Sequence, residues 1–159
     1  MCGSLHLSLI LNFSTPFCSY DAVIDLTRAL NARPPPATAA ATLTILRSLF
    51  PSWLPGAFAV LFSRPFPKLA AWINAEATAA TCEWLMGPSV VNDGGEGGLG
   101  GRTGVRVERC RYLEATGCVS ACLNSCKLPT QAFFARDMGL ALTMTPDFET
   151  YEVRRRGGG

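Results

Sequence analysis

The sequence predicts a mainly α-helical single domain of the α+β class, with a small β element and a cysteine-rich C-terminal segment. Apolar residues recur at helical spacing through the first half of the chain, whereas short alternating segments follow a glycine-rich stretch in the second half. The 159 residues suffice for one domain, and 48% of them are hydrophobic against 16% charged. This composition favours a folded chain over a disordered one.

Four segments in the first half carry helical signals. They are residues 21–32, 37–50, 58–62 and 68–86. Consecutive prolines end the first segment, Pro51 and Pro55 separate the second from the third, and Gly87 with Pro88 ends the fourth. We expect residues 58–62 to form a short apolar turn or helix and residues 68–86 to form one helix.

The second half predicts a short helix and two strands. Residues 129–138 begin with a proline and end before Gly139, which occupies the position of a C-terminal helix cap. Residues 105–107 and 140–146 alternate between apolar and polar side chains, as strands do. The arginine- and glycine-rich residues 154–159 contain no core-forming side chain, and we expect a disordered tail there.

A glycine-rich loop covers residues 93–104. Within it, residues 95–100 match the G-x-G-x-x-G pattern of dinucleotide-binding proteins, which requires a strand before it and a helix after it. A strand-like segment follows instead. We therefore interpret the loop as a low-complexity linker.

The first 19 residues contain no charged side chain but several serines, and we interpret them as a transit-peptide remnant or a disordered segment. They lack the basic start of a secretory signal, so we expect the thiols to lie in a reducing compartment. The most apolar stretch, residues 49–62, is interrupted by prolines and too short to span a bilayer, so any membrane contact is expected to be peripheral. A net charge of +2 without a basic, aromatic-interleaved stripe argues against nucleic acid as a partner.

Four of the seven cysteines fall within 17 residues, spaced C-x7-C-x3-C-x3-C. They are Cys110, Cys118, Cys122 and Cys126. One interpretation is a thiolate metal site, for which this spacing resembles an iron–sulfur arrangement more than a zinc site. The other is that the last three cysteines share one helix face and pack in the core as ordinary buried thiols.

Two constraints narrow the metal interpretation. The single histidine, His6, excludes a 2-His-1-carboxylate iron centre, which favours an iron–sulfur cluster and leaves a haem with one cysteine ligand as an alternative. On a straight helix Cys118 and Cys126 would be about 12 Å apart along the axis. A shared centre therefore requires the helix to bend, and Asn124 and Ser125 offer a place for that.

Four basic residues flank these thiols: Arg106, Arg109, Arg111 and Lys127. Nearby cations lower the pKa of a thiol and offset the charge of an anionic cluster. The alternative, to which we give equal weight, is that these basic side chains simply form a solvent-exposed face of a strand.

With these residues in view, the C-terminal third resembles the dwarf-type β-carotene isomerases of plastids. The resemblance rests on VERCRYLEATGC at residues 107–118, on the C-x3-C-x3-C-K-x-P-T-Q string that follows, and on WLMGP at residues 84–88. It covers residues 20–153, which we therefore take as the isomerase-like domain. Members of the family usually carry a further cysteine just after the position of Phe148 and Glu149, whereas this chain has Val153 and the Arg/Gly tail.

The resemblance implies an iron-dependent isomerase that interconverts all-trans- and 9-cis-β-carotene in strigolactone biosynthesis, located in the plastid (chloroplast). Iron, either alone or as an iron–sulfur cluster, is the expected cofactor, with the four clustered cysteines as candidate ligands. The expected partner is a carotenoid substrate.

A pocket for a carotenoid would be long and apolar. The candidate lining residues are Trp72, Trp84, Met86, Phe133 and Phe134. A non-catalytic, metal-stabilised carotenoid- or lipid-binding module is the alternative function, and a structural helical domain with core cysteines is a third.

Overall fold

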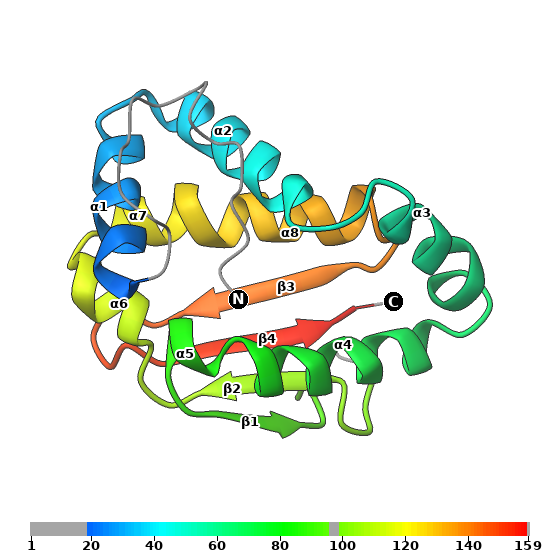
Figure 1. Ribbon diagram of the computed structural model, residues 1–159. Helices are drawn as coiled ribbons and strands as arrows, with labels where there is room; N and C mark the ends of the chain where they lie inside the picture. Colours follow the sequence, from blue (N-terminus) through cyan, green and yellow to red (C-terminus); the bar gives the residue numbers. More distant parts are fainter. Residues whose placement is uncertain (1–18, 96–98, 159) are drawn as a thin grey trace.

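The computed structural model describes residues 19–95 and 99–158, which form helices packed on a four-stranded antiparallel sheet. In chain order the elements are α1 (Tyr20–Asn31), α2 (Pro35–Ser48), α3 (Leu54–Phe58), the π-helical turn η1 (Ala59–Ser63), α4 (Pro67–Thr81), α5 (Glu83–Met86), β1 (Ser89–Asn92), β2 (Gly104–Val107), α6 (Arg111–Thr116), α7 (Val119–Cys122), the π-helical turn η2 (Leu123–Lys127), α8 (Leu128–Arg136), β3 (Leu142–Pro146) and β4 (Val153–Gly157). Figure 1 shows this arrangement. The predicted α+β class is confirmed. The predicted segment 1–19 lies, except for Ser19, outside the described residues.

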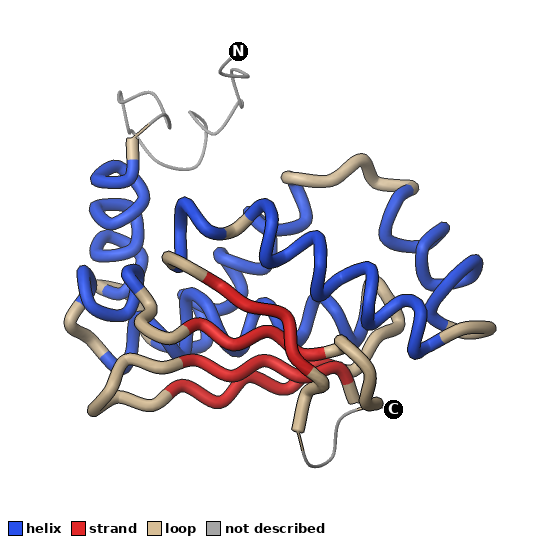
Figure 2. Tube along the Cα trace, turned by 90° about the horizontal axis from the view of Figure 1, so that it is seen from below, coloured by secondary structure: helices blue, strands red, loops and turns tan. Residues whose placement is uncertain are grey.

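The helices gather on one side of the sheet, whose strand order is β1-β2-β4-β3 (Figure 2). Alternate residues of the strands face these helices and are buried: Val105, Val107, Leu142, Met144 and Val153. The residues between them, such as Arg106 and Arg154, are exposed. The domain therefore has two layers, with its core between the helices and one face of the sheet.

Small side chains bring α4 close to the sheet. Ala70, Ala71 and Ala75 are buried on this helix, which contacts β1 and β2. Gly157 in β4 lies directly beneath it, because a Cβ atom at this position would stand 2.9 Å from the Cβ of Ala71. Glycine is required here by the close approach of helix and strand.

A second helical contact joins α2 to α8. The Phe50 ring, just after α2, stacks on Phe133 of α8 with 5.3 Å between the ring centroids. Phe133 is 1% exposed and also meets Phe134 edge to face. This aromatic cluster joins the two halves of the chain.

Two of the predicted helices differ in their bounds. Pro35 lies in the first turn of α2 and Pro55 in the first turn of α3, so these prolines begin helices rather than interrupt them. The predicted single helix 68–86 is wrong in one respect, because it divides at Cys82 into α4 and α5. Neither glycine nor proline marks this break in the sequence.

The glycine-rich segment connects β1 to the antiparallel strand β2, and residues 96–98 within it are not described. Strand β2 is the next element after the described glycines, whereas a dinucleotide-binding motif requires a helix at that place. Strand β1 was not predicted.

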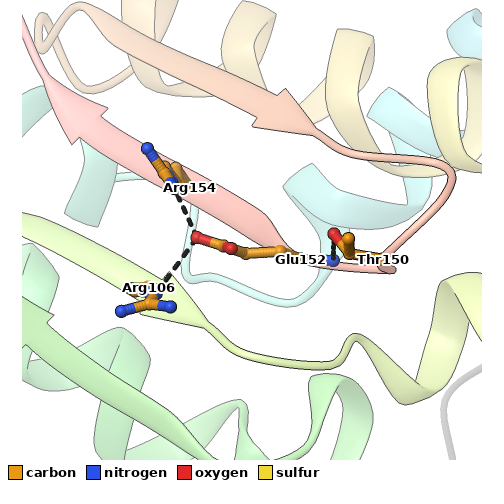
Figure 3. A network of polar contacts seen from close by, with 4 residues as sticks. All are labelled: Arg106, Thr150, Glu152 and Arg154. Carbon is orange, nitrogen blue, oxygen red and sulfur yellow. Dashed lines mark hydrogen bonds and ion pairs between the residues drawn. The ribbon is translucent and has the colours of Figure 1, made fainter.

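The prediction of a disordered tail is wrong for residues 154–157, which belong to β4, the strand between β2 and β3. Arg106 of β2 lies directly opposite Arg154 of β4, an unfavourable like-charge pair. Glu152 bridges the two: its Oε1 lies 3.0 Å from Nε of Arg106 and 2.6 Å from Nε of Arg154 (Figure 3). This shared carboxylate allows an arginine-rich segment to form a strand.

Replacing Phe133 by alanine is expected to lower the free energy of unfolding by about 3–5 kcal/mol, because a fully buried ring leaves a cavity. The half-exposed Phe148 is the matched control, and Phe148→Ala is expected to cost less than about 1 kcal/mol. Urea denaturation followed by circular dichroism measures both variants. Equal losses would contradict the assigned role of Phe133 in the core.

Glu152→Gln is expected to destabilise the sheet at neutral pH, because Arg106 and Arg154 then face each other without a shared carboxylate. The hydrogen bond from Arg154 lowers the pKa of Glu152 in the folded chain. A lowered folded-state pKa stabilises the fold above the unfolded value, and this contribution disappears as the pH falls through the folded value. The difference in melting temperature between wild type and variant should therefore shrink below about pH 4. Glu149→Gln is the control, and a difference that persists unchanged in acid would refute the assignment.

Candidate three-thiol site

Three of the four clustered cysteines line one small internal cavity. Cys110 is the residue before α6, Cys122 ends α7, and Cys126 lies in the π-helical turn η2. The remaining lining residues are Met86, Tyr112, Lys127, Met144, Pro146 and Val153. The free space is about 10 Å³, near the lower limit for one water molecule.

Cys118 is not part of this cavity. It lies at the surface, at the start of α7, and is exposed. The predicted set of four thiols is thus divided by the structure into three that adjoin and one that faces solvent.

The π-helical turn η2 places Cys126 beside Cys122. Helices α7, η2 and α8 follow one another without a break, and Pro129 lies in the first turn of α8. Proline has no backbone N–H to donate, and a widened turn before it accommodates that missing donor. The π-helical turn includes Asn124 and Ser125. These are the residues at which the sequence predicts that the helix departs from a straight α-helix.

Contacts from α1 fix this turn. The Thr27 hydroxyl lies 3.0 Å from the buried Tyr112 hydroxyl, and the Asn31 amide donates to Ser125 Oγ at 2.9 Å. Burial raises the pKa of Tyr112, so the phenol stays protonated. Sequence reasoning missed Tyr112, although it lies in the resembling string.

Burial keeps the three thiols in their neutral form. It raises the pKa of Cys110, that of Cys122 to about 11 and that of Cys126 to about 12. The neighbouring thiols raise the last two values further, and Lys127 lowers that of Cys122 only in part. At neutral pH the cavity therefore contains S–H groups rather than thiolates.

Most of the predicted flanking cations have other partners. Arg106 pairs with Glu152, Arg109 with Glu114, and Arg111 lies over the Tyr20 ring at 3.8 Å. Lys127 alone of the four lines the cavity. The solvated basic face is the better description of the three arginines.

A cation that the sequence did not indicate lies nearby. Arg155 of β4 points to the helical side of the sheet, donates a hydrogen bond to Thr78 Oγ1, and lies over the Phe134 ring at 4.6 Å. Burial lowers its pKa to about 10, so it remains charged at neutral pH. Its charge lowers the pKa of Cys126, though less than burial raises it.

The residues present do not fit a metal centre as they stand. Within residues 19–95 and 99–158, no group of three or more histidine, cysteine or acidic side chains is arranged to hold a metal ion. Metal ligation requires thiolates, and burial makes deprotonation of these thiols costly as long as no cation is bound. The geometry supports the alternative in which the thiols pack in the core, because Cys110 and Cys122 belong to its main cluster.

The five predicted pocket residues do not meet in one pocket. Met86 lines the thiol cavity, Phe133 is fully buried, and Phe134 packs beside it. Trp84 is 57% exposed. Trp72 instead lines a shallow surface groove of about 470 Å³ with Phe66, Pro67, Lys68, Leu69 and Gly101.

Comparison with known proteins finds one matching family model and similar proteins in two plants. Residues 84–156 match the family model described as "Beta-carotene isomerase D27-like, C-terminal". The chain is similar to the chloroplastic beta-carotene isomerase D27 of Medicago truncatula, with 38% identity over 85 residues, and to that of Arabidopsis thaliana, with 35% identity over 107 residues. These alignments cover 54% and 66% of this chain but 34% and 40% of the relatives. No solved structure matches the chain significantly.

Every residue that lines the thiol cavity lies within the matched segment 84–156. Val153 is among them, and its apolar side chain lies beside the three thiols.

The burial of the thiols predicts their order of reaction with an alkylating reagent. In the folded chain Cys118 is expected to react at least about tenfold faster than Cys110 and Cys122, because only an accessible thiol meets the reagent. Mass spectrometry of peptides after timed labelling measures each site separately. In denaturant the rates should become similar, and equal rates in the folded chain would contradict the cavity.

Proposed function

Because residues 84–156 carry a D27-like C-terminal domain, we propose that the chain is a carotenoid cis/trans isomerase acting on β-carotene or a related carotenoid. The observation that carries this proposal is the match of that segment, which contains the whole three-thiol cavity. Both relatives are named chloroplastic, and the plastid is the proposed location.

The substrate limits the chemistry. A carotene has no acidic or basic group, so general acid–base catalysis has nothing to act on. Rotation about a polyene double bond requires that its bond order be lowered temporarily. The protein must therefore supply a group that reacts reversibly with a carbon–carbon double bond.

The thiols of Cys110, Cys122 and Cys126 are the candidate groups. Addition breaks the S–H bond and one carbon–carbon π bond, forms one C–S and one C–H bond, and leaves a single carbon–carbon bond free to rotate. Elimination breaks both new bonds, restores the double bond and returns the proton to sulfur, so that no electrons are gained or lost overall. Because the thiolate is the nucleophile and burial raises the pKa of these thiols, the proton must leave sulfur as the C–S bond forms, and that proton supplies the C–H bond.

A carotenoid can reach the three thiols only if the side chains around the cavity move apart. The closed cavity of about 10 Å³ is far smaller than any carotenoid. In our proposal the cavity opens when substrate binds, and Met86 and Met144, which line it, are adaptable side chains suited to such a change.

Iron dependence is a separate hypothesis that the described side chains do not support. The three adjoining thiols are not arranged as ligands, so the proposed reaction contains no step on iron. Iron and acid-labile sulfide content of anaerobically purified protein tests this hypothesis directly. Stoichiometric iron would restore it.

A non-catalytic carotenoid- or lipid-binding module is the second candidate. The favouring observation is that the thiol cavity is closed while the Trp72 groove is open to solvent. Such a module would bind a carotenoid and return it with its double-bond geometry unchanged.

Chromatography of carotenoid isomers tests the proposed function. Incubation of all-trans-β-carotene with the chain is expected to yield a cis isomer, and Cys122→Ala is expected to reduce the rate at least about tenfold by removing a reacting group. Cys118→Ala is the matched control, because it removes an exposed thiol outside the cavity. Circular dichroism establishes that each variant is folded.

The outcomes separate the candidates. Binding of carotenoid by the wild-type chain without isomerisation would favour the binding module. Full activity of a folded variant in which Cys110, Cys122 and Cys126 are all alanine would refute the thiol mechanism while leaving the isomerase assignment in place.

A further inference from the structure

Helix α3 and the turn η1 lie at the end of the molecule opposite α1 and α6 (Figure 1), and large apolar side chains are exposed there and at the adjoining start of α4. We name this region the α3–α4 surface. Its apolar members are Trp53, Val60, Leu61, Phe66, Leu69 and Trp72. Trp53 is 68% exposed, Leu61 62% and Phe66 58%. Phe66, Leu69 and Trp72 line one shallow groove, and the other three belong to the preceding segment 53–61, whose elements contact one another and α4. Exposed large apolar side chains of this kind mark interaction sites.

The inner side of the same segment is firmly packed. Phe58 and Phe62 contact the buried cluster of Ala70, Ala71 and Leu140, and Ser63 Oγ donates to the Met138 carbonyl at 2.6 Å. The outward side chains are therefore presented by an anchored helical segment. Their exposure does not come from a poorly packed loop.

The segment that carries this surface is basic. Residues 53–72 contain two basic side chains, Arg64 and Lys68, and no acidic one. Both are exposed and lie among the apolar members. In the described part of the chain, no ion pair involves either of them.

The carboxylates that adjoin the surface are neutralised by other cations. Glu76 pairs with Arg102 at 2.6 Å, and Asp137 pairs with Arg47 at 2.8 Å. Glu76 also accepts a hydrogen bond from the Trp72 indole, which holds that ring at the border of the surface. The exposed face therefore combines apolar side chains with an excess of positive charge.

We infer that the α3–α4 surface binds the face of a lipid bilayer that contains anionic lipids. Tryptophan and phenylalanine are favoured at the boundary between headgroups and acyl chains, and lysine and arginine are attracted to anionic headgroups. No helix among the described residues is long and apolar enough to cross a membrane. The inferred contact is interfacial, and it does not depend on isomerase activity.

Vesicle sedimentation with the purified chain tests the inference. The chain is expected to bind vesicles of phosphatidylcholine with about one third phosphatidylglycerol and to bind pure phosphatidylcholine more weakly. Raising the ionic strength from about 0.02 M to about 0.5 M should reduce the partition coefficient several-fold, because salt screens the headgroup attraction.

Matched variants locate the contact. Leu61→Asn is expected to lower the partition coefficient at least about tenfold. Val119→Asn is the control, because Val119 is similarly exposed but lies on α7, at the opposite end of the molecule. Arg64→Gln with Lys68→Gln should weaken the salt-dependent part, whereas Arg28→Gln with Arg33→Gln should not.

A second measurement does not require a polar substitution in the surface. In the Trp84→Phe background, brominated lipids are expected to quench the fluorescence of Trp53 and Trp72 when the chain binds. Absence of binding to phosphatidylglycerol vesicles at low salt would overturn the inference. Equal effects of Leu61→Asn and Val119→Asn would also overturn it, as would a dimer that forms without lipid and is abolished by Leu61→Asn.

Discussion

The pairing of β4 with β2 on one side and with β3 on the other is the interaction on which the rest of the domain depends. It places three residues of one short strand in three different roles on the helical side of the sheet. Val153 fills the thiol cavity, Arg155 carries a charge beneath the helices, and Gly157 lets α4 approach. Without β4, strands β2 and β3 would not belong to one sheet, and the buried residues of the two strands would not face the helices from a single layer.

The helices could be predicted from local signals, whereas β4 could not. Prolines and helical periodicity located α1, α2 and α8. The last ends at Arg136, two residues earlier than predicted, and Gly139 follows it with a φ of 64°. Three consecutive arginines instead suggested a solvated tail. Only the register with β2 shows that Glu152 offsets the facing arginines and that Val153 and Gly157 are buried. A register between distant segments is not visible in one sequence.

The candidate site, like the fold, could be predicted from the sequence only in part. Cysteine spacing identified three residues that do adjoin, but it also included Cys118, which the start of α7 turns to the solvent. Whether thiols serve as metal ligands depends on their protonation state and on the distances between their sulfur atoms. Both are set by burial against Tyr112, Met144 and Val153, which come from α6, β3 and β4.

The π-helical turn η2 has a consequence for the permissible length of this segment. A π-helical turn contains one residue more than the α-helical turn that it replaces. Deleting that residue from η2 would restore an α-helical turn before Pro129, in which the proline ring clashes with the carbonyl four residues earlier. Related chains should therefore preserve the number of residues in this turn together with Cys126, whose thiol lines the cavity.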